Sequence, residues 1–190
     1  MWFYPLVPGY LKGYVRRFAQ KSPDHRGTEE SPGRVVTLVH QEEWHEFSPS
    51  DSFPDTDVVW GVAFTINPAY AAEVRDLLDL REIAGYTLEE INVYGVGPDG
   101  GEVVVVQRAQ VYVARKDNPA FVANESLEEI AGVIWRSVGP SGTNEEYLYN
   151  LGSAIRDLAP ESEDSHLVAL ESLCRKWDQE LVGSGRKGEE

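Results

Sequence analysis

A carboxylate stands at an unusual position in the stretch LDLREIAGY, residues 78–86. The apolar residues around it predict a helix, on which Glu82 follows Val74 and Leu78 at four-residue spacing and so continues the apolar stripe. Burial and the negative end of a helix both raise the pKa of a carboxyl group, as a general base near neutral pH requires. On the residues alone, a Glu82 that turns outward to solvent, or that pairs with Arg81 or another arginine, is the favoured alternative.

A second group of interest lies in GPSGTNEEYL, residues 139–148, where two glycines and a proline lead into a predicted helix. Free backbone N–H groups at such a helix start could bind a carboxylate, although an ordinary turn explains the same pattern and is favoured. Tyr147 falls on the inward stripe of this helix. If buried, its hydroxyl requires a hydrogen-bond partner, either a neighbour or a substrate.

Several common catalytic motifs are absent from the sequence. It contains no phosphate-binding loop, no dinucleotide glycine fingerprint and no G-x-S-x-G nucleophile elbow. The four histidines show no metal-ligand spacing with Cys174, so no metal site is predicted. Cys174 itself lies beside the apolar stripe of the last predicted helix, which indicates a buried thiol rather than a nucleophile.

The composition restricts the kind of partner. A net charge of −15, from 17 basic and 32 acidic residues, argues against electrostatic binding of nucleic acid or an anionic membrane. The segment from Lys12 to Arg34 reverses this balance and could attract an anionic small molecule, although charges interspersed on an edge strand explain it equally well. One cysteine excludes an intramolecular disulfide, and no stretch has the length or the leader pattern of a membrane span or signal peptide. We therefore expect a cytoplasmic protein.

The predicted elements indicate an α+β protein, because strands dominate the first half of the chain and helices the second. The 190 residues suggest one domain over residues 1–182, followed by a glycine-rich, charged and disordered tail at 183–190. Residues 41–57 have no periodicity and are expected to form a solvent-exposed loop. Strands are predicted at 11–19, 34–40, 58–66 and in a hairpin over 91–114, and helices at 68–81, 127–138, 145–158 and 165–182. Ser126 with Glu129 and Thr143 with Glu146 predict capping boxes at the starts of the second and third of these helices.

Five stretches resemble, in the same order, the ChaC-like, glutathione-specific γ-glutamylcyclotransferases. They cover most of residues 10–175 and include the signatures DHRG, GRVVTL, RE-x-x-GY and GPSG-x-N-x-EYL, which are specific in combination. The matching ranges are 13–39, 58–66, 80–86, 117–121 and 134–151.

The resemblance implies a compact mixed β-barrel flanked by helices. It also implies an enzyme that cleaves glutathione into 5-oxoproline and cysteinylglycine with no cofactor and no added water. The family's general base, the glutamate of RE-x-x-GY, corresponds to Glu82. The tyrosine of the EYL motif, which lines the family's substrate pocket, corresponds to Tyr147, and Arg26 of DHRG is a further candidate for shaping that pocket.

The sequence departs from the family pattern near its start. Family members usually open with a strand and a glycine-containing loop close to YGSLIWK, whose backbone N–H groups bind the γ-glutamyl group. Here MWFYPL is followed directly by VPGYLKGYVRRF, and the first glycine is Gly9. Two hypotheses follow: a γ-glutamylcyclotransferase with Glu82 as base, or a catalytically impaired relative that binds a γ-glutamyl ligand or a protein partner.

Overall fold

The structure is a computed structural model that describes residues 3–49, 51, 53, 58–81, 86–115, 117–160 and 164–185. Its strands are β1 (Phe3–Leu11), β2 (Tyr14–Ser22), β3 (Gly33–His40), β4 (Val59–Ile66), β5 (Tyr86–Val96), β6 (Glu102–Ala114), β7 (Val138–Gly139) and β8 (Gly142–Thr143). Its helices are α1 (Gln41–Phe47), α2 (Ala71–Arg81), which follows a single 3₁₀ turn η1 (Pro68–Tyr70), α3 (Leu127–Arg136), α4 (Asn144–Leu158) and α5 (Ser165–Gly185).

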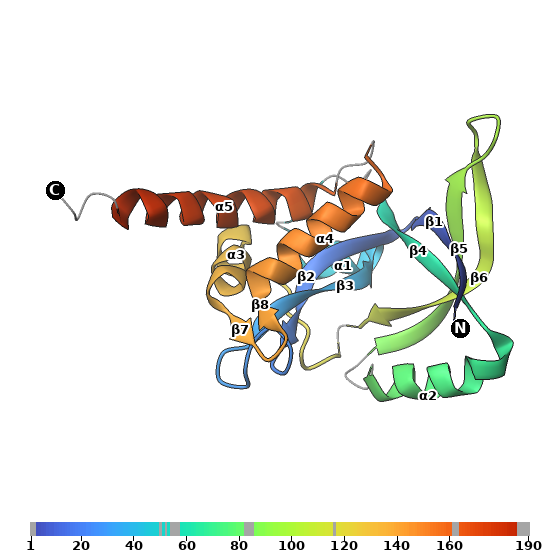
Figure 1. Cartoon of the computed structure of the whole chain (residues 1–190), viewed down its shortest axis with the longest axis horizontal. Coiled ribbons are helices and arrows are strands. Elements are labelled where there is room, and N and C mark those ends of the chain that lie inside the picture. Colours follow the sequence, from blue (N-terminus) through green and yellow to red (C-terminus); the bar gives the residue numbers. More distant parts are fainter. Residues whose placement is uncertain are drawn as a thin grey trace.

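The six long strands form two antiparallel sheets. One sheet has the order β4-β1-β5-β6, and the other consists of β2 and β3. Helices α3, α4 and α5 gather on the side of β2 and β3, while the four-stranded sheet and α2 lie on the other side of the molecule (Figure 1). The predicted α+β class is confirmed. Within the described parts of the chain no ladder joins the two sheets, so the strands do not close into a full barrel.

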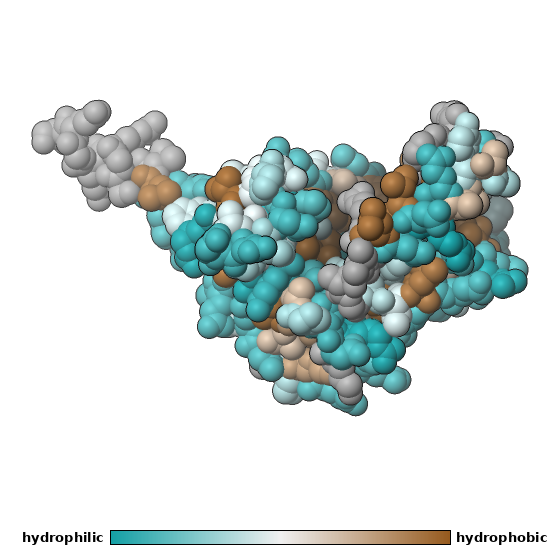
Figure 2. All heavy atoms as spheres, turned by 90° about the horizontal axis from the view of Figure 1, so that it is seen from below, coloured by the Kyte–Doolittle hydropathy of each residue, from teal (hydrophilic) through white to brown (hydrophobic). Residues whose placement is uncertain are grey.

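In the four-stranded sheet, the two central strands, β1 and β5, share little of their length as a ladder. Strand β1 pairs with β4 from Leu6 to Leu11, but it pairs with β5 only through Tyr10 and Tyr94. Large apolar side chains remain exposed on these strands, and Figure 2 shows apolar patches on this part of the molecule. The exposed residues include Leu6, Phe64, Leu88, Val103 and Val104.

The main core lies where the helices meet β2. Phe18 of β2 packs with Ile134 of α3, Leu148 of α4 and Leu170 of α5, and all four are fully buried. Cys174 belongs to the same cluster, and burial raises the pKa of its thiol to about 12. The prediction of a buried, unreactive cysteine is therefore confirmed.

Two helices begin as the sequence predicts, with one difference. At α3, Ser126 and Glu129 form the full reciprocal capping box. At α4, Thr143 accepts a hydrogen bond from the backbone N–H of Glu146, but the Glu146 carboxylate binds Arg26 instead of returning to the cap. The second predicted capping box is therefore only half formed.

The expectation of a solvent-exposed loop over residues 41–57 is wrong at its start. Residues 41–47 form α1, and Trp44 is 5% exposed. The Trp44 ring packs edge-on against Phe121, at 6.2 Å between centroids, and lies near the guanidinium of Arg17. These partners are distant in the sequence, so a local pattern could not reveal them.

Helix α5 is the longest of the described helices and runs along one edge of the molecule (Figure 1). It continues to Gly185, three residues beyond the expected domain boundary, and residues 186–190 lie outside the described part of the chain. None of the described helices is long and apolar enough to cross a membrane.

Candidate active site

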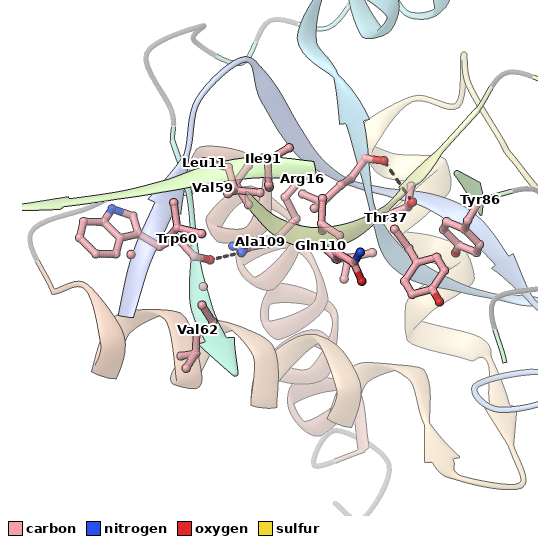
Figure 3. Close-up of a pocket in the computed structure, with 18 residues that line it drawn as sticks. Leu11, Arg16, Thr37, Val59, Trp60, Val62, Tyr86, Ile91, Ala109 and Gln110 are labelled. Carbon is pink, nitrogen blue, oxygen red and sulfur yellow. Dashed lines mark hydrogen bonds between the residues drawn. The ribbon is translucent and has the colours of Figure 1, made fainter. Parts of the chain in front are cut away.

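A cavity of about 390 Å³ lies between the two sheets and is lined by residues of all six long strands (Figure 3). This volume is within the range of small-molecule sites. Most of the wall is apolar, with a few polar groups among the lining side chains, as is usual for such sites. The lining residues are Gly9, Leu11, Arg16, Val36, Thr37, Leu38, Val59, Trp60, Gly61, Val62, Ala63, Tyr86, Ile91, Val93, Ala109, Gln110, Val111 and Tyr112.

Two paired glycines help to shape this cavity. Gly9 of β1 lies opposite Gly61 of β4. A Cβ atom at Gly9 would lie 2.5 Å from the backbone oxygen of Tyr94, so only glycine allows β1 to approach β5 this closely. A Cβ atom at Gly61 would meet nothing within 4 Å. The glycine at position 61 therefore leaves open space at the cavity wall.

Helix α2 is hydrogen-bonded to the strand that forms one wall of the cavity. The Tyr112 hydroxyl donates to Asp79 Oδ1 at 2.7 Å, and Arg75 Nη2 donates to Gln110 Oε1 at 3.0 Å. Both partners on β6 line the cavity, so these two bonds fix the position of α2 beside it.

Glu82 lies outside the described residues. In the chain it follows the last residue of α2, Arg81, and it precedes by four positions Tyr86, which begins β5 and lines the cavity. The predicted stripe that leads to it is partly confirmed, because Val74 is buried and Leu78 is partly buried.

Tyr147 approaches the cavity from the helical side. Its hydroxyl oxygen accepts a hydrogen bond from the backbone N–H of Val36, at 3.4 Å, and Val36 lines the cavity. Burial raises the pKa of Tyr147, while the Val36 N–H and the charges of Arg16 and Arg26 act in the opposite direction. The phenol is therefore protonated near neutral pH, and in the described part of the chain its proton has no acceptor.

Arg26 contacts Tyr147 rather than the cavity. Its guanidinium carbon lies 5.6 Å from the centre of the Tyr147 ring. Its Nη1 donates to the Thr143 carbonyl at 2.9 Å and to Glu146 Oε2 at 2.8 Å. The structure thus brings these two predicted residues together, with Arg26 behind the tyrosine ring at the start of α4.

The GPSG turn is an ordinary connection into α4. The Ser141 N–H donates to the His25 carbonyl, and the Asn144 N–H donates to the Ser137 carbonyl, each at 2.9 Å. A Cβ atom at Gly139 would lie 2.2 Å from the His25 carbonyl oxygen, so the turn packs directly on the DHRG segment. Because these N–H groups already have partners, the alternative of an anion-binding turn is not supported.

The sequence did not single out two buried polar residues, Arg16 in the cavity wall and Asn144 at the start of α4. Arg16 lines the cavity and is 9% exposed, and only the basic character of its segment pointed toward it. Asn144 is fully buried and pairs with the backbone of Arg34: its Oδ1 accepts from the N–H at 2.6 Å and its Nδ2 donates to the carbonyl at 2.7 Å. Among the described residues, no group of three His, Cys, Asp or Glu side chains is placed to hold a metal ion.

Two sheets around a ligand-sized cavity, with α3, α4 and α5 beside the smaller sheet and α2 beside the larger, define an α+β protein with a candidate small-molecule site. A family model described as ChaC-like protein matches residues 2–177, so the chain belongs to the ChaC-like family. A glutathione-specific gamma-glutamylcyclotransferase of Schizosaccharomyces pombe is 43% identical over 173 residues, which cover 91% of this chain and 84% of that protein. Its counterpart in Saccharomyces cerevisiae is 36% identical over 205 residues, covering 90% and 88%.

Solved structures agree with this assignment. The crystal structure of a glutathione-specific gamma-glutamyl cyclotransferase from yeast, in its selenomethionine form, has a TM-score of 0.76 and 34% identity, and the match covers 92% of this chain and 89% of that one. A second structure under the same description has a TM-score of 0.73 at 34% identity, covering 92% and 91%. The chain therefore has the γ-glutamylcyclotransferase-like fold that the sequence resemblance implied.

Proposed function

We propose that this protein is a γ-glutamylcyclotransferase that acts on glutathione and releases 5-oxoproline and cysteinylglycine. The observation that carries the proposal is the 43% identity to a glutathione-specific enzyme across 91% of this chain. The cavity between the sheets supports it, since its size suits a small peptide. We place the reaction in the cytoplasm, because a single cysteine suits a reducing compartment. We assign it to a single domain over residues 1–182, as the length of the chain suggests.

The chemistry is an intramolecular aminolysis. The α-ammonium group of the γ-glutamyl moiety loses a proton to Glu82, and the resulting amine attacks the γ-carbonyl carbon to close a five-membered ring. The tetrahedral intermediate then collapses as the C–N bond to cysteine breaks. Glu82 returns the proton to the leaving amine. The ring nitrogen gives up its second proton as the lactam forms, and the released amine takes that proton up, so no water is consumed.

The protein's main task is to hold the reacting groups together. Well-oriented intramolecular reactions reach effective molarities of about 10⁵–10⁸ M, because nucleophile and electrophile are already tethered. Tyr147 supports the bent substrate by donating a hydrogen bond from its hydroxyl group, which lies near the cavity wall at Val36. Arg26 acts behind it by holding the aromatic ring in place.

Release of 5-oxoproline from glutathione by the purified full chain tests the proposal. Replacing Glu82 by Gln removes the base and is expected to lower the rate by at least about 10²-fold. Glu90→Gln is the matched control, because Glu90 is an exposed glutamate whose carboxylate pairs with Arg108. If the wild-type chain and Glu82→Gln release 5-oxoproline equally slowly, the enzymatic function is wrong for this chain.

A further inference from the structure

Among the described residues that line the cavity, Arg16 is the single charged side chain. It comes from β2 and points toward β4, where Trp60 forms the facing wall (Figure 3). Its side chain is only 10% exposed, so the guanidinium is largely removed from water. The other described side chains of the cavity wall are uncharged, and a buried cation interacts more strongly with an anion than an exposed one does.

Two of the hydrogen bonds of Arg16 fix its orientation. Nη1 donates to Asp164 Oδ2 at 2.9 Å, and Nη2 donates to the carbonyl oxygen of Trp60. A guanidinium has five N–H donors. In the part of the chain that the structure describes, the Nε–H and one N–H of each terminal nitrogen have no acceptor. The group is therefore held in place and still has donors available for a ligand.

The neighbouring arginine has a different environment. The Arg17 side chain is 5% exposed, and its Nε donates to Asp51 Oδ2 at 2.8 Å. Its guanidinium lies near the rings of Trp44 and Phe53, at 5.7 and 5.3 Å, and it does not line the cavity. Arg17 joins segments within the fold, whereas Arg16 combines a similar ion pair with a position on the cavity wall.

The polar neutral groups of the cavity are less suited to a carboxylate. Gln110 accepts from Arg75 through Oε1, and the N–H donors that remain on its amide are neutral, so they bind a carboxylate more weakly than a guanidinium does. Tyr112 already donates its hydroxyl proton to Asp79. Glutathione carries two carboxylates, one on the γ-glutamyl group and one on glycine. We propose that Arg16 binds a carboxylate of the γ-glutamyl peptide through charge-assisted hydrogen bonds, an assignment that rests on the proposed function. Asp164 offsets part of the Arg16 charge, so the binding depends on directed N–H bonds as well as on attraction.

The test uses an unreactive ligand, glutaryl-cysteinyl-glycine, which keeps both carboxylates but lacks the attacking amine. Its dissociation constant can be measured by calorimetry, or by the change in the chain's tryptophan fluorescence, to which Trp60 at the cavity wall contributes. Losing a charged hydrogen bond typically weakens an interaction about tenfold to 100-fold, so Arg16→Gln is expected to raise the dissociation constant by that factor. Arg17→Gln is the matched control and is expected to lower the melting temperature without this loss of affinity.

Two ligand analogues separate direct contact from a structural role. Each replaces one carboxylate by an amide, either on the glutaryl end or on glycine. The wild-type chain should lose affinity for the analogue whose carboxylate Arg16 binds, and Arg16→Gln should bind that analogue and the parent ligand equally. If each analogue loses the same affinity relative to the parent ligand in the wild-type chain and in Arg16→Gln, the proposal is overturned.

A second variant keeps the test valid if Arg16→Gln fails to fold. Arg16→Lys keeps the charge but cannot form two parallel hydrogen bonds to a carboxylate. In a folded Arg16→Lys protein, replacing the ligand's carboxylate by an amide should therefore cost less affinity than in the wild-type chain; this loss of affinity is the amide penalty. An unchanged penalty in Arg16→Lys would also overturn the proposal. Because binding does not require Glu82, an inactive wild-type chain that still shows the Arg16 effect refutes the proposed reaction alone. An active chain without the effect refutes the Arg16 assignment alone.

Discussion

The guanidinium of Arg26 lies over the aromatic ring of Tyr147, with its central carbon 5.6 Å from the ring centre. The same guanidinium binds Glu146 and the Thr143 carbonyl, so one side chain connects the DHRG segment to the first turn of α4. The Tyr147 ring also packs edge-on against Phe18, with 5.9 Å between the ring centroids. The hydroxyl is thereby held at Val36, beside the cavity.

Removing this hydroxyl is expected to affect the reaction more than the fold. Tyr147→Phe keeps the packing against Phe18 and loses a single long hydrogen bond from Val36, which should cost about 1 kcal/mol of unfolding free energy. We expect kcat/KM for glutathione to fall about tenfold, measured by 5-oxoproline release. Tyr149→Phe is the control: its hydroxyl, on the same helix, donates to Asp178. Equal activity losses in both variants would contradict a substrate contact for Tyr147.

Replacing Arg26 should have a smaller, indirect effect. Arg26→Met removes a cation over an aromatic ring and an ion pair with Glu146, whose side chain is 55% exposed. Such interactions are each worth about 0.5–1 kcal/mol, so the loss of stability should be modest. If Arg26 acts only by holding Tyr147, adding Arg26→Met to Tyr147→Phe should lower kcat/KM little further. Additive losses in this double-mutant cycle would indicate an independent role for Arg26.

A side chain at Gly61 tests whether the substrate occupies the cavity. The space beside Gly61 is open, so Gly61→Val should fill part of the cavity without a clash and also favour the strand. We expect KM for glutathione to rise about tenfold or more, and the melting temperature to stay the same or increase. Thr65→Val, an exposed position on the same face of β4 outside the cavity wall, should leave KM unchanged. An unchanged KM in Gly61→Val would place the substrate elsewhere.

The elements that the sequence predicted are those with local signals. The β5–β6 hairpin follows from strand residues on both sides of GPDGG, where Gly100 has a φ of 79°. The start of α3 follows from its capping box at Ser126. Strand β1 and helix α1 were missed, because β1 is defined by its pairing with β4 and α1 by the burial of Trp44.

The site was predictable only in part, for a similar reason. The family motifs pointed to Glu82, Tyr147 and Arg26, and the structure brings the last two into contact. The sequence could not separate Arg16 from Arg17, because they are adjacent residues of one type. Their difference arises from what surrounds β2: one lies on a cavity built from six strands, and the other lies near Asp51 and Trp44.

Asn144 is expected to contribute strongly to stability. Its amide pairs with both backbone groups of Arg34 in the interior, so Asn144→Ala leaves a buried donor and a buried acceptor without partners. The expected loss is about 3 kcal/mol of unfolding free energy, measured by urea denaturation. Asn150→Ala, at an exposed position of the same helix, should change it by less than about 0.5 kcal/mol. A small loss in Asn144→Ala would mean that water replaces the amide.

His166 is expected to make the fold sensitive to acid. Burial, together with the positive charge of Arg17, lowers the pKa of His166 to about 3 from the ordinary 6.5, while Asp51 acts in the opposite direction. Its Nε2 accepts from the backbone N–H of Phe18 at 3.2 Å, which requires a neutral ring. As the pH falls below 6.5, the unfolded chain takes up a proton that the folded chain excludes. Stability is therefore fully present above this pH and decreases toward pH 3.

The contribution of His166 can be isolated by the slope of stability against pH. One such group lowers the unfolding free energy by up to about 1.4 kcal/mol for each pH unit in this window. His166→Gln keeps an acceptor for Phe18 but cannot titrate, so its slope between pH 6 and pH 4 should be shallower than that of the wild-type chain by about that amount. His25→Gln, at an exposed histidine, should retain the wild-type slope. Parallel curves for all three proteins in urea unfolding would show that His166 is not buried as a neutral ring.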